Sequence, residues 1–221
     1  MSLSKGIVLD LQRYYAPLGP TAPPAATWAD LSRYKTDGTI TGAAWVRQPN
    51  GLYALDFNGA TPDFVGITAP QMNFIAGDFS FVFRMKPALT AAEAMIFDRG
   101  VFNTDGYWIR FDADARVLVN TFQAAATQLT YTNANAIVAG TMSTIGVSRS
   151  GANVYIYKNG VNDVAVSGSH INPTTAARTV RMGADRAGTR PYTGVHQLVL
   201  GYSRSLSAGE HKQIHDNLVR Q

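Results

Sequence analysis

Short apolar runs with a period of two recur along the chain, and they restrict the fold more than any other feature. Gly, Asn, Asp and Pro break these runs at intervals of roughly eight to twelve residues, which is typical of a sandwich of antiparallel strands. Helical periodicity is nearly absent before the C-terminal end. We therefore predict an all-β protein with two packed sheets and strands at 7–11, 53–57, 64–67, 79–85, 94–98, 107–112, 117–121, 128–132, 141–148, 153–158, 161–166, 179–182 and 195–202.

The sharpest local signal is the stretch from Val154 to Val161. Asn159 and Gly160 separate two strand-like runs, and both residue types tolerate the positive φ that a type I′ turn requires. This pattern predicts a two-residue β-hairpin.

A second local signal lies near the C-terminus. Ser207 and Glu210 have the spacing of a capping box, in which each side chain binds the backbone N–H of the other residue. Ile214 and Leu218 follow four residues apart, so both fall on one helical face. We predict a short C-terminal helix that packs on the sandwich.

The domain organisation is predicted to be simple. Sandwiches of about this length fold as one domain, and no stretch of the 221 residues resembles a linker, so we predict one domain over 1–221. The segment 16–27 contains four prolines, which lack backbone N–H groups, and is therefore predicted as a surface loop. Cysteine is absent, which excludes disulfides, thiolate catalysis and Cys-ligated metal centres.

Charge and hydropathy exclude two classes of partner. The net charge is +4, but Arg and Lys are scattered and form no basic block, so nucleic-acid binding is not expected. The apolar run 7–9 is too short for a signal peptide or a membrane span, so membrane insertion is not expected either.

Ten blocks, taken in order along the chain, carry a family resemblance: 55–59, 63–65, 78–87, 95–100, 106–111, 144–149, 159–161, 180–185, 194–202 and 206–208. Together they resemble the laminin-G-like family of the concanavalin A-like lectin/glucanase superfamily. The resemblance implies a two-sheet antiparallel jelly roll and a habit of binding sugars, proteins or surfaces through loops, sometimes with calcium. His196 and Gln197 stand where many relatives carry an acidic pair, which puts the calcium site in doubt.

Two groups of oxygen-bearing side chains are candidate calcium ligands, because hard cations favour clustered carboxylate and carbonyl oxygens. For both groups the alternative is turn chemistry, in which the side-chain oxygens accept from nearby backbone N–H groups. No other cofactor is indicated. The candidates are Asp56, Asn58 and Asp63, followed by Asp112 and Asp114.

Catalytic signatures are weak. A retaining glycosidase needs two carboxyls about 5–5.5 Å apart, and neither Glu93 nor Glu210 has a carboxylate two residues away. His211 and His215 have the spacing of a zinc pair, but no third ligand is indicated, and a solvated helix face is the alternative. We therefore predict no enzymatic activity and retain an atypical glycosidase as the alternative.

Candidate ligand-binding residues fall in two places. If Ile109 faces the core, alternation turns Trp108 and Arg110 outward; the alternative places Trp108 between the sheets. The loop 185–192 gathers an acid, two arginines and a tyrosine, and the alternative, which composition favours, is an ordinary turn. The residues proposed to bind a ligand are Trp108, Arg110, Asp185, Arg186, Arg190 and Tyr192.

These observations predict a recognition module that binds a glycan or a cell-surface protein. The alternative is a structural or assembly domain of a viral or surface protein, which would form a homo-oligomer. Either function predicts an extracellular, cell-surface or virion-associated protein.

Overall fold

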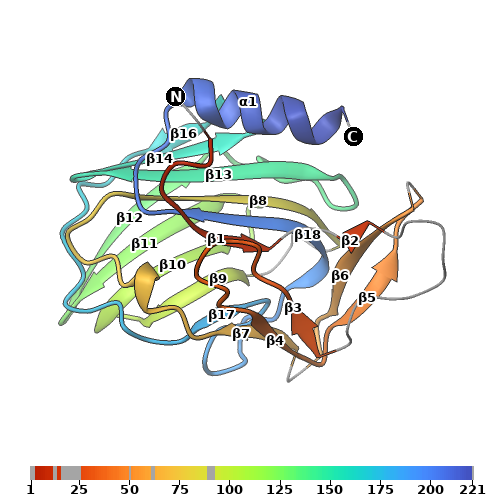
Figure 1. Cartoon of the computed structure of the whole chain (residues 1–221). Helices are drawn as coiled ribbons and strands as arrows, with labels where there is room; N and C mark the ends of the chain where they lie inside the picture. The colour runs from red at the N-terminus through yellow and green to blue at the C-terminus, as the bar shows by residue number, and fades with distance from the viewer. Residues whose placement is uncertain are drawn as a thin grey trace.

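Two antiparallel sheets lie face to face in the computed structural model, as the sequence predicts (Figure 1). The structure describes residues 3–11, 14–15, 26–49, 51–60, 63–88 and 93–220, with only the backbone described at 14–15. Within these residues each sheet contains nine strands. The all-β jelly-roll prediction is confirmed.

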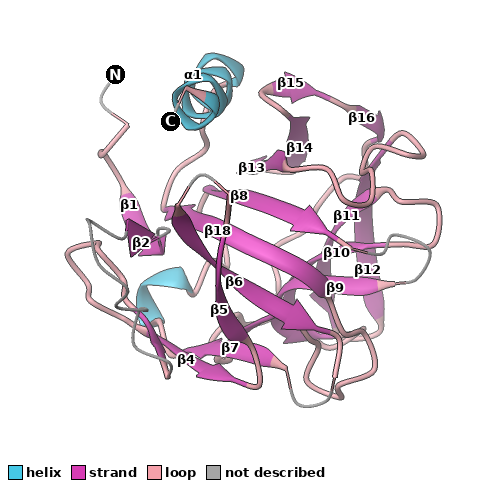
Figure 2. Ribbon diagram, turned by 90° about the vertical axis from the view of Figure 1, so that its right-hand side faces the viewer, coloured by secondary structure: helices cyan, strands magenta, loops and turns pink. Residues whose placement is uncertain are grey.

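The first sheet carries the C-terminal helix on its outer face (Figures 1 and 2). Two strands lie beside its main path, since β1 (Ile7–Leu11) pairs with β18 and β5 (Ala44–Arg47) pairs with β6. The main path runs in the order β15 (Val161–Asn162), β14 (Asn153–Lys158), β13 (Ser143–Ser150), β8 (Phe79–Pro87), β18 (Thr193–Tyr202), β6 (Leu52–Asn58) and β2 (Tyr14–Tyr15).

The second sheet forms the other layer and presents its outer face on the opposite side of the sandwich from the helix. Its order is β16 (Val164–Val166), β12 (Ala126–Thr132), β11 (Val117–Gln123), β10 (Asp105–Phe111), β9 (Ala94–Val101), β17 (Val180–Met182), β7 (Phe64–Ile67), β4 (Gly38–Thr41) and β3 (Thr27–Trp28).

Aromatic side chains from alternate strand positions fill the space between the sheets. Phe81 and Phe83 of β8 meet Phe97 of β9, and the ring centroids of Phe81 and Phe97 are 4.5 Å apart. Tyr107 of β10 stacks on Phe79 at 5.0 Å and is fully buried. Interdigitating rings of this kind explain why the period-two pattern predicts the sandwich.

The hairpin prediction is confirmed. Asn159 and Gly160 have φ angles of 51° and 79°, and they connect β14 to β15. The prediction of one strand over 161–166 is wrong: β15 stays in the first sheet, whereas β16 pairs with β12 of the second. The Asn162 side chain accepts from the Val164 N–H at 3.2 Å and turns the chain between the two sheets.

The N-terminal part contains strands that the sequence pattern does not reveal. The short strands β2, β3, β4 and β5 lie between the predicted strands at 7–11 and 53–57. They are only two to four residues long, which is too short to show an apolar alternation. Of the predicted proline-rich loop 16–27, residues 16–25 lie outside the described residues, and Thr27 belongs to β3.

The predicted helix is α1 (Ala208–Val219), and its capping box is present. The Ser207 Oγ accepts from the Glu210 N–H, and the Glu210 carboxylate accepts from the Ser207 N–H at 2.9 Å. Ile214 is buried and Leu218 packs partly against the same apolar cluster on β8 and β18. The helix is therefore tied to the first sheet by its apolar face (Figure 1).

We expect Glu210→Gln to lower the free energy of unfolding by about 1 kcal/mol at pH 7. Arg204 donates to both Glu210 oxygens, at 2.7 and 3.0 Å, and with Ser207 it lowers the pKa of Glu210 to about 2. Unfolding raises that pKa, so the ion pair stabilises the fold at neutral pH and its contribution is lost as the pH falls from about 4.5 to 2. Urea titrations should therefore show a smaller difference from the wild type at pH 3 than at pH 7.

Asp216→Asn is the matched control for this prediction. Asp216 pairs with Lys212 on the exposed side of the same helix, where ion pairs contribute little. The substitution should leave the free energy of unfolding nearly unchanged. Equal losses in both variants would contradict the prediction.

Candidate functional site

Two distant segments come together on the outer face of the second sheet. β10 turns Trp108 and Arg110 away from the core, while Tyr107 and Ile109 point into it. The loop that joins β17 to β18 lies beside the start of β9, because the Met95 N–H donates to the Arg190 carbonyl at 3.0 Å. Of the two alternatives for Trp108, the structure follows the one in which Trp108 and Arg110 point away from the inter-sheet core.

Glu93 links the two segments through ion pairs. Its carboxylate accepts from Arg110 Nη1 at 2.7 Å and from Arg190 Nε at 2.6 Å. Arg190 also donates from Nη1 to Asp185 at 2.9 Å, and its guanidinium carbon lies 5.4 Å from the centroid of the Trp108 ring. We name these five residues, Glu93, Trp108, Arg110, Asp185 and Arg190, the Arg190 cluster.

The loop conformation depends on Asp185. Its Oδ1 accepts from the Thr189 N–H and its Oδ2 from the Thr189 hydroxyl, both at 2.7 Å. Burial acts to raise the pKa of Asp185, but the bonds from Thr189 and Arg190 outweigh it and hold that pKa below its usual value. The carboxylate is therefore ionised at neutral pH and fixes Arg190 in place.

Asp98 holds the neighbouring part of the surface. It is fully buried and accepts from Trp108 Nε1 at 3.1 Å and from the backbone N–H groups of Gly100 and Arg186 at 2.8 and 2.9 Å. Burial raises the pKa of Asp98, which these bonds and the nearby Arg186 guanidinium oppose. The predicted residue Arg186 is thus anchored behind the Arg190 cluster and does not belong to it.

Two of the predicted ligand-binding residues are covered. Trp108 faces outward but is only 7% exposed, because Met95, Phe122 and Arg190 pack over its ring. Tyr192 is fully buried beside Phe57, at a centroid distance of 5.8 Å. The prediction that Tyr192 contacts a ligand is wrong, because its ring completes the core where β18 begins.

Phe102 is an exposed aromatic residue that the sequence reasoning missed. It lies in the turn between β9 and β10 and is 57% exposed. The centroid of its ring is 6.1 Å from that of Trp108 and 5.8 Å from that of Phe122. An aromatic residue within a turn rich in Asn, Asp and Gly was the available signal. Phe102 gives the Arg190 cluster an apolar neighbour that solvent can reach.

The first group of calcium candidates does not form a metal site. Asp63 is buried, and one of its oxygens accepts from the Asn58 N–H at 2.6 Å. Burial raises the pKa of both Asp56 and Asp63, which disfavours the ionised form that a cation needs. No group of three or more His, Asp or Glu side chains is placed to hold a metal in the described part of the chain.

The second group of calcium candidates follows the turn alternative. Asp112 Oδ1 accepts from the N–H groups of Asp114 and Arg116, each at 3.0 Å, and its Oδ2 accepts from Arg116 Nε at 2.8 Å. Asp114 pairs with the same arginine at 2.5 Å. The oxygens are occupied within the turn, so these residues do not fit a calcium ion.

The helix histidines do not form a zinc pair. His211 is buried and its Nε2 lies 2.8 Å from the Ser148 hydroxyl, whereas His215 Nδ1 lies 3.0 Å from the Thr144 hydroxyl. Each ring is therefore engaged with a different residue of β13.

No helix among the described residues is long and apolar enough to cross a membrane.

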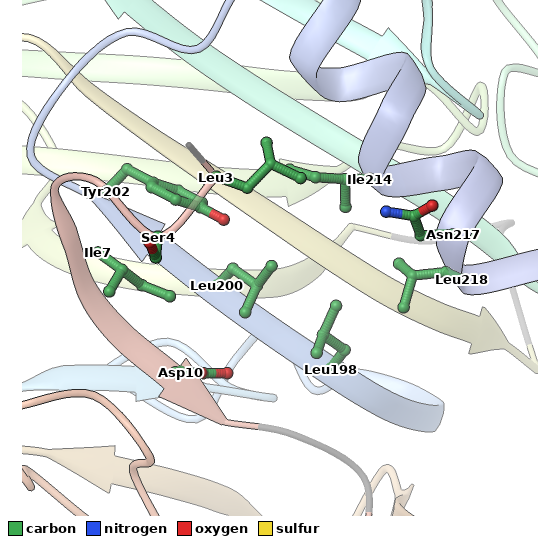
Figure 3. A pocket seen from close by; sticks show the side chains of 10 residues that line it. All are labelled: Leu3, Ser4, Ile7, Asp10, Leu198, Leu200, Tyr202, Ile214, Asn217 and Leu218. Atoms are coloured by element: carbon green, nitrogen blue, oxygen red, sulfur yellow. The ribbon is translucent and has the colours of Figure 1, made fainter. Parts of the chain in front are cut away.

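A cavity of about 300 Å³ separates α1 from the first sheet and the N-terminal segment (Figure 3). Its aliphatic lining comes from Leu198 and Leu200 of β18, Ile214 and Leu218 of α1, and Leu3 and Ile7 of the N-terminal segment, and Ser4, Asp10, Tyr202 and Asn217 complete it. The exposed lining surface is mainly apolar and includes no Arg or Lys side chain, so the Arg190 cluster is the better candidate for a site that recognises a polar ligand.

The family and the fold can be compared with known proteins. The family model described as the concanavalin A-like lectin/glucanases superfamily matches residues 61–210. No curated protein matches the sequence.

The solved structures with the same fold include binding domains of toxins. The binding domain of Paraclostridial Mosquitocidal Protein 1 is similar with a TM-score of 0.77 and 14% identity, over 98% of this chain and 53% of that one. The receptor binding domain of botulinum neurotoxin D follows at 0.75 and 12%, over 99% and 54%. The binding domain of botulinum neurotoxin DC, in complex with rat synaptotagmin II, gives 0.71 and 14%, over 98% and 52%. The chain thus spans about half the length of these structures, and at this identity the likeness shows the fold.

Proposed function

Because the chain belongs to the concanavalin A-like lectin/glucanase superfamily, we propose that it is a non-catalytic recognition module for a glycan or a cell-surface protein. Similar structures support a binding role: one is a complex of the botulinum neurotoxin D binding domain with N-acetylneuraminic acid, and another is a complex of the neurotoxin DC binding domain with rat synaptotagmin II. The matched part is about half of those domains, so the ligand of this chain is argued from its own residues. The proposal treats residues 1–221 as a single module.

The exposed ring of Phe102 beside the Arg190 cluster is the observation that carries the proposal. Sugar rings stack their apolar faces on aromatic side chains, while guanidinium and carboxylate groups bind the hydroxyls. Phe102 offers the ring, and the partly exposed Arg190 and Glu93 offer a donor and an acceptor, with side chains 31% and 43% exposed. The ion pairs fix both polar groups before a ligand arrives, which reduces the entropy lost on binding.

The chemistry of the same face argues against catalysis. A glycosidase requires a general acid whose pKa is raised and which reaches the substrate. Glu93 is engaged by two arginines, and the pKa of Asp185 is lowered by its bonds. Asp98 has a raised pKa but is fully buried, and both of its oxygens accept hydrogen bonds.

The proposal extends to location and assembly. A module of this kind acts outside the cell, on a surface or in a secreted protein, as the toxin binding domains do. The assembly alternative predicts a mass in solution that rises with concentration, whereas a recognition module stays monomeric or has a fixed mass. Light scattering over a range of concentrations distinguishes the two.

A glycan array tests the recognition proposal directly. We expect the wild-type chain to bind a defined glycan subset, equally with calcium and with chelator, because the calcium candidates do not form a site. Phe102→Ala should weaken that binding at least about tenfold, the loss of one stacked ring. Binding is expected to persist in Tyr155→Ala, which removes a 38% exposed aromatic from β14 of the other sheet.

The array outcomes discriminate between the alternatives. A blank wild-type array would contradict the glycan proposal and leave a protein ligand or assembly. Binding that survives Phe102→Ala would move the site away from the Arg190 cluster. Loss of binding with chelator would contradict the absence of a calcium site.

A further inference from the structure

A second cavity, of about 250 Å³, lies apart from the Arg190 cluster. It is lined by the 3₁₀ turn η1 (Pro70–Met72), by Arg99 near the end of β9, and by the segment 177–179 that leads into β17. Each of these elements is remote from the others in sequence. The cavity has room for a compact ligand group together with waters.

Arg99 is the only fully buried charged side chain among the residues that line this cavity in the described part of the chain. It is 1% exposed, donates from Nε to the Ala176 carbonyl at 2.5 Å, and donates from Nη2 to the Ala69 carbonyl at 3.0 Å. The third nitrogen, Nη1, has no hydrogen-bond partner among the described residues. A buried donor without an acceptor is costly and is rare in folded proteins.

The charge of Arg99 is also unbalanced. No carboxylate of the described residues lies within ion-pair distance of it, and Arg186 adds a further positive charge nearby. Arg178 lines the same cavity but is already neutralised, since its Nε and Nη2 donate to the two oxygens of Asp105 at 2.6 and 2.5 Å. Burial of an unpaired charge is unfavourable unless a counter-ion is supplied.

We propose that this cavity binds an oxyanion group, a carboxylate, sulfate or phosphate, with Arg99 as its principal partner. A guanidinium group suits such oxygens because its N–H donors match their spacing. The anion supplies the negative charge that the fold leaves out beside this buried cation, and a small movement of the lining side chains lets it reach Nη1, which the fold covers when the cavity is empty. The carbonyls of Ala69 and Ala176 hold the guanidinium in place before the anion arrives.

This site is independent of the glycan proposal, and it holds whether the oxyanion is free or part of a larger acidic ligand. Inorganic phosphate probes the first source and N-acetylneuraminic acid, which carries a carboxylate, probes the second. Saturation by phosphate alone assigns a free anion, and saturation by the sugar acid alone assigns a carboxylate on a ligand.

The test is a titration followed by the ¹⁵Nε–Hε resonance of Arg99 at constant ionic strength. We expect a saturable shift with a dissociation constant on the order of millimolar, as for one charged group in a small cavity. Arg99→Met should abolish saturable binding. Ala177→Phe keeps Arg99 and fills the cavity from an exposed lining position, so it should weaken binding at least tenfold.

Arg33→Met is the charge-matched control, because Arg33 is exposed and donates to the adjacent Tyr34. It should bind both probes as the wild type does. If Arg99→Met does not fold, Ala177→Phe decides the question alone. A wild-type titration that never saturates with either probe, or equal binding by Ala177→Phe, would overturn the proposal.

Discussion

Gly146→Ala is expected to lower the free energy of unfolding by about 3 kcal/mol, near the upper end for an overpacked interior. Gly146 lies on β13 under the C-terminal helix, and a Cβ there would stand 2.2 Å from Nδ1 of His211. His211 is 2% exposed, stacked on Tyr157 at 4.1 Å and bonded to Ser148, so it has no free space to move into. The added methyl group therefore pushes α1 away from the sheet.

A double-mutant cycle separates this clash from any effect on the strand itself. His211→Ala removes the ring that the new methyl group would meet, so Gly146→Ala should cost at most about 1 kcal/mol in that background. The coupling free energy between the two substitutions is then about 2 kcal/mol. Its sign means that the double variant is more stable than the sum of the two single losses predicts. Urea unfolding of the four proteins measures it, and hydrogen exchange of α1 reports whether the helix has detached.

Equal costs of Gly146→Ala in the two backgrounds would contradict this account. They would show that the strand itself resists the side chain. Gly66→Ala is a useful comparison, because its Cβ meets only the Phe64 ring at 3.6 Å, an ordinary contact, in β7 of the other sheet. We expect it to cost far less than Gly146→Ala.

The features that sequence reasoning predicted well are those fixed by neighbours along the chain. The alternation in β10 determines that Ile109 points inward and Trp108 outward, and the structure confirms both directions. The turn at Asn159 and the capping box at Ser207 likewise depend on residues only a few positions apart. Local chemistry of this kind can be recognised without knowing the rest of the fold.

The features that it missed depend on pairings across long distances in sequence. Glu93 and Arg190 are 97 residues apart, and no local pattern indicates that one carboxylate joins Arg110 to the loop 185–192. The burial of Tyr192 follows from the way β18 enters the first sheet, which loop composition does not reveal. Phe102 matters only because the fold places it over Trp108.

The second large effect is a loss of stability in mild acid. Three histidines are buried and neutral, and burial is the main cause that lowers the pKa of each: to about 4 for His170, about 3 for His196 and about 4 for His211. His170 lies between the hydroxyls of Thr121 and Thr130, at 2.9 and 2.8 Å. In His196 neither ring nitrogen has a partner among the described residues.

The sign follows from proton binding in the two states. An unfolded histidine has a pKa of about 6.5, so between pH 6.5 and 4 the unfolded chain binds protons that the folded chain excludes, and stability falls as the pH falls. At pH 5 each buried histidine costs about 2 kcal/mol relative to pH 7, or roughly 6 kcal/mol together. That is comparable with the whole stability of an ordinary domain.

Carboxyl groups affect this pH range less. Groups with a lowered pKa, such as Glu210, lose their contribution only below about pH 4.5. The raised pKa values of Asp56, Asp63 and Asp98 act in the opposite direction, since those groups favour the folded state on protonation. The histidine effect is therefore read most cleanly between pH 7 and 5.

His196→Leu isolates one histidine from the other two. The His196 ring packs among Phe57, Phe83 and Tyr192. Leucine has a similar volume and replaces an unsatisfied polar group with an aliphatic one. The substitution should therefore raise the free energy of unfolding by about 1–2 kcal/mol at pH 7. At pH 5 the gain over the wild type should grow by about a further 2 kcal/mol, because the variant no longer excludes that proton.

His215→Gln, at a partly exposed ring, is the control and should leave most of the pH dependence in place. Urea titrations at pH 7, 6 and 5 measure all three proteins. A wild-type chain as stable at pH 5 as at pH 7 would mean that the folded state takes up these protons, and the core around His196 would then have to open to admit water.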